Sequence, residues 1–130
     1  MEAIQPARPF LVRWGPAILI MSVIFTLSSL PSYSLPDFGS QDLLVKKFGH
    51  AAGYALLAVS IQWGLGRNDL KGIFLAWFLT VCYAASDELH QAFVPGRSAS
   101  LVDVGIDASG AALGLLMSRY LWLRSPQKSR

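Results

Sequence analysis

The sequence predicts an all-α protein, a bundle of four transmembrane helices, and two observations support this. Hydrophobic residues make up 53% of the 130 residues and charged residues only 15%, whereas soluble domains average about 25% charged residues. The apolar residues are also grouped into four segments, each near the roughly 20 residues that a bilayer-spanning helix needs. One short domain cannot bury four such segments in a water-soluble core, so a lipid bilayer is the expected surroundings.

The first helix is expected within residues 14–36, a stretch without any charged residue. Pro16 is tolerated in a first helical turn. The preceding segment carries Arg8 and Arg13 and superficially resembles the start of a signal peptide. Because the apolar run is too long and no small-x-small cleavage site follows it, we expect a retained helix.

Ser28 and Ser29 lie near the exit of this helix, which Pro31 and Pro36 mark. Serines at such positions usually cap the backbone or bond to the carbonyl four residues back. We therefore expect a backbone role for them rather than a role in a site.

A polar loop is expected over residues 37–47, and a second apolar segment follows from Phe48 to Gly66. Gly49 and Gly53, with the alanines between and after them, have the small-residue spacing that suits close approach of another helix.

The third helix is expected to start at Gly72 and to extend as far as Val94, because the following Pro95 discourages helical geometry in the residue before it. Its single Cys82 excludes an internal disulfide and is expected to be a packed thiol.

The fourth helix is expected to run to about Leu123. Ser100 and Asp103 have the S-x-x-D spacing of a capping box at its start. Gly110 and Gly114 form a second small-residue seam within it.

Lysine and arginine residues are distributed unequally between the two ends of this bundle. Eight lie on the side of the termini and three, Lys46, Lys47 and Arg97, on the other side. The positive-inside rule predicts a multi-pass protein with both termini in the cytoplasm. Because the sequence carries no other compartment signal, a bacterial-type plasma membrane is expected. Residues 1–13 are then a cytoplasmic segment, 14–123 the membrane domain and 124–130 a basic cytoplasmic tail. Because the basic residues form no stripe with interleaved aromatics, nucleic acid is not an expected partner.

This orientation places three polar clusters, distant in sequence, at the same extracytoplasmic face: Ser28 and Ser29, the set of Lys47, His50 and Tyr54, and the set from Asp87 to Asp107. Helical spacing puts Lys47, His50 and Tyr54 on one side of their helix, and Asp87, His90 and Gln91 on one side of theirs, with Glu88 slightly apart. Asp103 and Asp107 share a stripe of the last helix. The polar residues concerned are Lys47, His50 and Tyr54; Asp87, Glu88, His90 and Gln91; Arg97 in the following turn; and Asp103 and Asp107. Since polar groups are costly near lipid, we expect these side chains to line one polar site.

The chain resembles the VanZ-like family of small bacterial membrane proteins over about residues 20–117. The resemblance rests on Lys-x-x-His-x-x-x-Tyr over 47–54, Ser-Asp-Glu-x-His-Gln-x-Phe-Val-Pro-Gly-Arg over 86–97, Asp-x-x-x-Asp-x-x-Gly-x-x-x-Gly over 103–114, and Ser-Ser-Leu-Pro over 28–31. Two features depart from the family pattern. Lys46 and Ala51 stand where Asp and Phe are usual, and Asp107 stands where Asn is usual.

The resemblance implies an integral membrane protein of the cell envelope. The founding member of the family is associated with resistance to teicoplanin, a glycopeptide antibiotic that acts on cell-wall precursors. The expected function is therefore an effect on glycopeptide susceptibility or on the handling of wall precursors, with the bilayer and a wall precursor or glycopeptide as partners.

A membrane-embedded enzyme that acts on a lipid-linked phosphate or wall precursor is the alternative. In that hypothesis His50, Glu88, His90 and Asp103 are catalytic, by passing protons. Substrate binding would fall to Lys47, Tyr54, Asp87, Gln91, Arg97 and Asp107, with the cations holding a phosphate or carboxylate.

Three further hypotheses stay open. Two histidines beside acids offer metal donors, but Glu-x-His is not a recognised ligand spacing and His-Glu-x-x-His is absent, so no metal or cofactor is assigned. The residues could instead form a structural network, in which Asp103 caps a helix and Arg97 pairs with Glu88 or Asp87. A proton-linked transport path is the third, although the charges gather at one end of the bundle.

Overall fold

The computed structural model describes residues 8–125, and over this range it consists of helices without any strand. The all-α prediction is confirmed. The long helices are α1 (Phe10–Ser29), α2 (Asp42–Leu65), α3 (Leu70–Gln91) and α4 (Leu101–Arg124). Two short 3-10 turns, η1 (Ser32–Ser34) and η2 (Gly39–Gln41), lie between α1 and α2. Most of the predicted cytoplasmic segment and tail, residues 1–7 and 126–130, lies outside the described residues.

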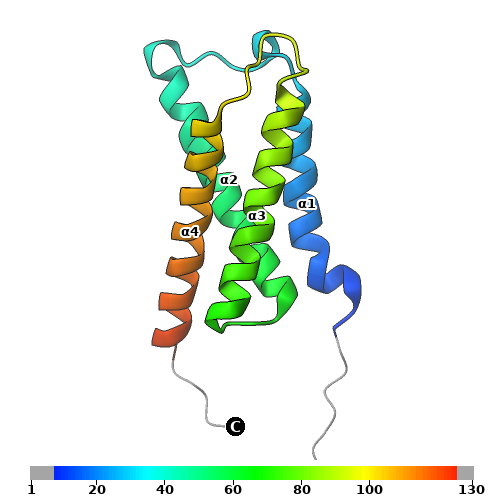
Figure 1. Cartoon of the computed structure of the whole chain (residues 1–130), viewed down its shortest axis with the longest axis vertical. Coiled ribbons are helices and arrows are strands. Elements are labelled where there is room, and N and C mark those ends of the chain that lie inside the picture. The colour runs from blue at the N-terminus through cyan, green and yellow to red at the C-terminus, as the bar shows by residue number, and fades with distance from the viewer. Residues whose placement is uncertain (1–7, 126–130) are drawn as a thin grey trace, which may run out of the picture.

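The four helices run alternately up and down side by side (Figure 1). The connections over residues 30–41 and 92–100 lie together at one end of the bundle, which we call the polar end. The connection over residues 66–69 lies at the other end, together with the start of α1 and the end of α4 (Figure 1). Segments distant in sequence therefore meet at the polar end.

Within the described part of the chain, three helices are long and apolar enough to cross a membrane: α1, α3 and α4, with 20, 22 and 24 residues. The fourth, α2, has 24 residues but carries Asp42, Lys46 and Lys47 in its first two turns. Large apolar side chains cover the outside of the bundle, and Phe74, Leu113 and others are more than half exposed. Such a surface is favourable in lipid and costly in water.

The helix bounds differ from those expected from hydropathy. α1 begins at Phe10 and ends at Ser29, before the prolines. α2 begins at Asp42, so Lys46 and Lys47 belong to a helix and not to the predicted loop. α3 ends at Gln91 and not at Val94, because the N–H of Val94 already turns back to the carbonyl of Gln91.

The closest helix contact joins α4 to α2 through small residues. A Cβ atom added at Gly110 would lie 2.8 Å from the Cα of Ala51, and one added at Gly114 would lie 2.9 Å from the Cβ of Ala55. The predicted seam on α4 is confirmed. The expectation for Gly49 is wrong, because a Cβ there would meet nothing within 4 Å.

Two residues end and start helices at the connection between α2 and α3. Gly66 has φ 65°, and its N–H bonds to the carbonyls of the last turn of α2. Asp69 then caps α3 by accepting a hydrogen bond from the N–H of Gly72. The hydrogen bonds from the Arg67 guanidinium lower the pKa of the Asp69 carboxyl, which keeps the cap anionic.

Candidate functional site: a polar cavity beside an apolar groove

A polar cavity of about 190 Å³ opens at the polar end, between α2, the end of α3, the following turn and the start of α4. Seven of the ten predicted site residues line it: Lys47, His50, Glu88, Gln91, Arg97, Asp103 and Asp107. The structure thus brings together side chains from three separate parts of the sequence.

Two charged contacts, one helical turn apart, cross from α2 to α4 along one wall of this cavity. The Nζ of Lys47 donates to the Oδ1 of Asp103 over 2.8 Å. The Nδ1 of His50 lies 3.6 Å from the Oδ2 of Asp107. Lys47 and His50 are three residues apart on α2, and Asp103 and Asp107 are four residues apart on α4. Each of these spacings places both side chains on one side of the helix, so the two contacts lie one above the other.

Asp107 is the most unusual group of the site. Its side chain is 1% exposed, and neither of its carboxylate oxygens has a hydrogen-bond partner among the described residues. Buried acceptors are normally paired, because an unpaired one costs free energy. The imidazole of His50 is near enough to reach it after a small movement. This pair can therefore hold a proton or pass it to a bound molecule.

Glu88 has a structural partner within the cavity. Its Oε2 accepts a hydrogen bond of 3.1 Å from the backbone N–H of Ser100, the residue before α4. The predicted capping box is wrong: the Ser100 side chain makes no capping bond, and Asp103 is bound by Lys47. A carboxylate from the neighbouring helix satisfies the N–H that a box residue would have bound.

Asp87 lies beneath the cavity, 4% exposed, and joins three helices. Its Oδ2 accepts hydrogen bonds from Ser28 of α1 at 2.7 Å, Tyr54 of α2 at 3.1 Å and Gln91 of α3 at 3.1 Å. The backbone role expected for Ser28 is therefore wrong. Ser29 does make the expected bond, to the carbonyl of Phe25.

Arg97 ties the turn after α3 to the end of α1. It donates to the carbonyls of Leu27 and Leu30 and to the Oε1 of Gln91. The Leu27 carbonyl, which also accepts from the N–H of Leu30, and the Leu30 carbonyl both lie where α1 ends, so the guanidinium ties down that end of the helix. The expected pairing of Arg97 with Glu88 or Asp87 is wrong for this reason.

His90 is placed apart from the other predicted residues. Its Nε2 lies 3.0 Å from the Oγ of Ser29, and its ring stacks on Phe25 at 4.8 Å between centroids. It lines neither the polar cavity nor the groove described next. Its neighbours belong to α1, whereas His50 faces α4.

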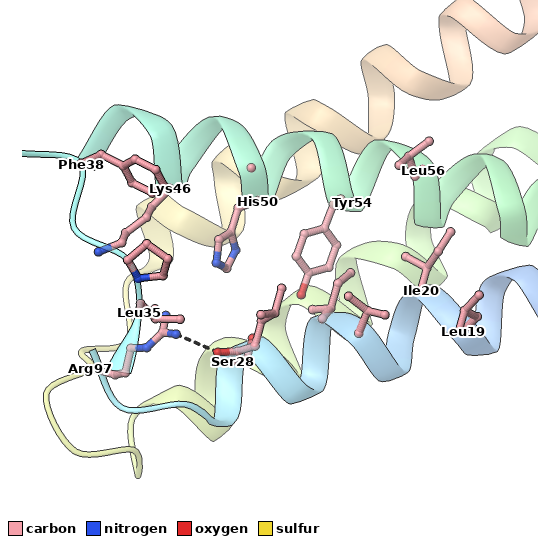
Figure 2. A pocket seen from close by; sticks show the side chains of 16 residues that line it. Leu19, Ile20, Ser28, Leu35, Phe38, Lys46, His50, Tyr54, Leu56 and Arg97 are labelled. Atoms are coloured by element: carbon pink, nitrogen blue, oxygen red, sulfur yellow. Dashed lines mark hydrogen bonds between the residues drawn. The ribbon is translucent and has the colours of Figure 1, made fainter. Parts of the chain in front are cut away.

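An apolar groove of about 460 Å³ runs between α1 and α2 and adjoins the polar cavity. Figure 2 shows Lys46, His50 and Arg97 at one end of it and Leu19, Ile20 and Leu56 toward the other. The same three polar residues, Lys46, His50 and Arg97, line both the groove and the cavity. Tyr54 lines the groove but not the cavity.

Lys46 is a site residue that the sequence reasoning missed. Its Nζ pairs with Asp42 at 2.6 Å and lies where the cavity and the groove meet. The signal was its spacing four residues before His50, which puts both on one helical side. The loop expected over residues 37–47 concealed it.

Within residues 8–125, no group of three or more histidine, cysteine, aspartate or glutamate side chains is placed to hold a metal ion. The side chains that line the cavity offer acids, one imidazole, one amide and cations as chemical groups. The cavity can bind an anionic or hydrogen-bonding head group and exchange a proton with it.

The bundle and its site define a class of small helical membrane proteins with a polar cavity at one end. The family model described as VanZ/LLP1 matches this chain over residues 14–123. The chain belongs to the VanZ/LLP1 family, as the sequence motifs indicated. Comparisons with curated proteins and with solved structures find no match.

Proposed function

We propose that this protein binds the polar head of a wall precursor or related envelope amphiphile in its polar cavity, and that this binding changes susceptibility to glycopeptides such as teicoplanin. The observation that carries the proposal is the convergence of three cations with an imidazole and a buried carboxylate at the polar end of an apolar bundle. The residues are Lys46, Lys47, Arg97, His50 and Asp107. Cations next to an unpaired carboxylate suit a head group that is both anionic and a hydrogen-bond donor.

The cavity faces the outside of a bacterial plasma membrane in this proposal, with both termini in the cytoplasm. Arg13, Arg67 and Arg119 belong to the end opposite the cavity, where Arg119 donates to the carbonyl of Asn68 and Arg13 to that of Leu65. The positive-inside rule supports this orientation. Wall precursors and glycopeptides meet at that outer face.

An enzyme acting on a lipid-linked phosphate is the second candidate, and the geometry of His50 and Asp107 favours it. A buried carboxylate with unpaired oxygens, 3.6 Å from an imidazole, is an arrangement that can move a proton. Glu88 and Asp103 line the same cavity, but each already has a structural partner. His90 would act in this candidate by positioning α1 through Ser29, since it does not reach the cavity.

Substituting the two histidines separately tests the proposal. We expect His50→Ala to return the minimum inhibitory concentration of teicoplanin to that of cells without the protein, because it removes the imidazole that lines both the cavity and the groove and faces Asp107. His90→Ala is the matched control and should keep most of the effect. Equal membrane abundance of each variant is checked by immunoblot. If both variants keep the full effect at equal abundance, the proposal is contradicted.

Asp107→Asn separates binding from turnover. The amide keeps the size and one acceptor oxygen, so a binding role predicts a largely unchanged inhibitory concentration. Turnover through His50 and Asp107 predicts a loss of about a hundredfold or more in rate, the usual contribution of an acid or base. Phosphate release from a polyprenyl phosphate or pyrophosphate is the measurement that detects such turnover.

A further inference from the structure

We propose that the groove between α1 and α2 holds one hydrocarbon chain of a single-chain or polyprenyl-type lipid phosphate, whose head lies among Lys46, His50 and Arg97. This inference rests on the proposed function in one respect: the head occupies the cavity already described. It adds the class of ligand, an amphiphile recognised by its chain as well as by its head.

The position of the groove supports a bound chain. Its lining extends along α1 from Leu19 to Ser28, a rise of about 14 Å at roughly 1.5 Å per residue. One leaflet of a hydrocarbon core is about 15 Å deep. The volume of about 460 Å³ lies within the range of small-molecule sites. The groove therefore offers one chain a path from the polar end to the middle of the bilayer.

The charges of the groove support an anionic head. Among the described residues that line it, the charged ones are Lys46 and Arg97, and none is a carboxylate. The acids Glu88, Asp103 and Asp107 lie on the cavity side instead. A phosphate that enters from the groove thus meets Arg97 and Lys46 first, the latter already paired with Asp42. A guanidinium and an ammonium are the usual phosphate donors.

Gly49 keeps the floor of the groove open. A Cβ at this position would meet nothing within 4 Å. The α2 residues that pack on α4, Ala51 and Ala55, point to another side of the helix. A larger side chain at Gly49 would fill the groove and leave the contact between α2 and α4 intact. Gly105 of α4 is equally open but lines neither the groove nor the cavity, so it supplies a matched control.

The experiment uses the full chain in phosphatidylcholine nanodiscs and a hexadecyl phosphate with a diazirine midway along its chain. After illumination, mass spectrometry locates the adducts. We expect them on groove residues such as Val23 and Ile24. Gly49→Leu should reduce them by about tenfold, because the leucine side chain would occupy space in the groove that the hydrocarbon chain needs. Gly105→Leu should change them by less than about twofold.

Competitors distinguish a lipid from a free phosphate. Unlabelled hexadecyl phosphate should displace the probe, whereas inorganic phosphate and butyl phosphate should not. Full displacement by butyl phosphate would show that the head alone is recognised, and would overturn the inference. If Gly49→Leu does not fold, Leu56→Trp at the groove rim takes its place, with the same expected loss.

Adducts spread evenly over the outer faces of α3 and α4, or an unchanged yield with Gly49→Leu, would also overturn the inference. The inference would also be overturned if the groove carried no lipid adducts and two copies of the chain were crosslinked there. That result would indicate a second copy as the occupant. If the groove result fails while His50→Ala still removes the teicoplanin effect, the proposed function stands without this inference. If adducts form in the groove but His50→Ala leaves the teicoplanin phenotype unchanged, the lipid-binding inference stands and the proposed function fails.

Discussion

Replacing Asp87 by alanine is expected to lower the free energy of unfolding by about 2 kcal/mol or more. The substitution removes one acceptor from three donors, Ser28, Tyr54 and Gln91, in a buried part of the bundle. Each hydrogen bond between membrane helices contributes on average about 0.6 kcal/mol, and leaving buried donors unpaired adds about 1 kcal/mol or more. Unfolding in mixed micelles, followed by the fluorescence of the four tryptophans, gives the measurement.

Asp87→Asn is the control for this prediction. The amide keeps an oxygen that can accept from Tyr54 and Ser28, so we expect less than half of the loss seen with alanine. Equal stability of the alanine and asparagine variants would show that Asp87 does not join the three helices in the membrane.

Replacing Gly110 by leucine is expected to destabilise the protein by about 3 kcal/mol or to prevent folding. A Cβ at this position would lie 2.8 Å from the Cα of Ala51, a backbone atom that cannot rotate away. The helices α2 and α4 would have to separate. Because the pairs of Lys47 with Asp103 and His50 with Asp107 cross this interface, the polar cavity would be lost as well.

Gly105→Leu, in the same helix, isolates the effect of packing from that of helix propensity. A Cβ there would meet nothing within 4 Å, so we expect stability equal to or slightly above that of the natural chain. The same micelle unfolding assay compares the two. A Gly110→Leu variant as stable as Gly105→Leu would contradict the close contact between α2 and α4.

The number of helices and their order could be predicted, because apolar length and proline positions determine them. The start of α2 could not, since hydropathy stops at Lys47 whereas backbone hydrogen bonding continues to Asp42. Charged residues are tolerated in those turns because they lie at the polar end.

The convergence of the polar residues could also be predicted, from topology and helical spacing. Their individual partners could not, because several donors and acceptors compete within a few ångströms. Arg97 bonds to the carbonyls at the end of α1, and Glu88 takes the N–H of Ser100, although sequence spacing favoured other pairs. The groove had no signal in the sequence, since it depends on the separation of α1 from α2.

Crosslinking at both ends of the bundle tests whether α2 and the start of α4 share a cavity that opens outward. In a Cys82→Ser background, Lys47→Cys with Asp103→Cys replaces an ion pair at the polar end, and Asn68→Cys with Arg119→Cys replaces a contact at the opposite end. Intact cells are treated with a short, membrane-impermeant bifunctional thiol reagent, and mass spectrometry identifies linked peptides. We expect the first pair to link in intact cells and the second only after permeabilisation. If the first pair stays unlinked even in permeabilised cells, the two helices do not form one site, and if it links only then, the cavity faces the cytoplasm.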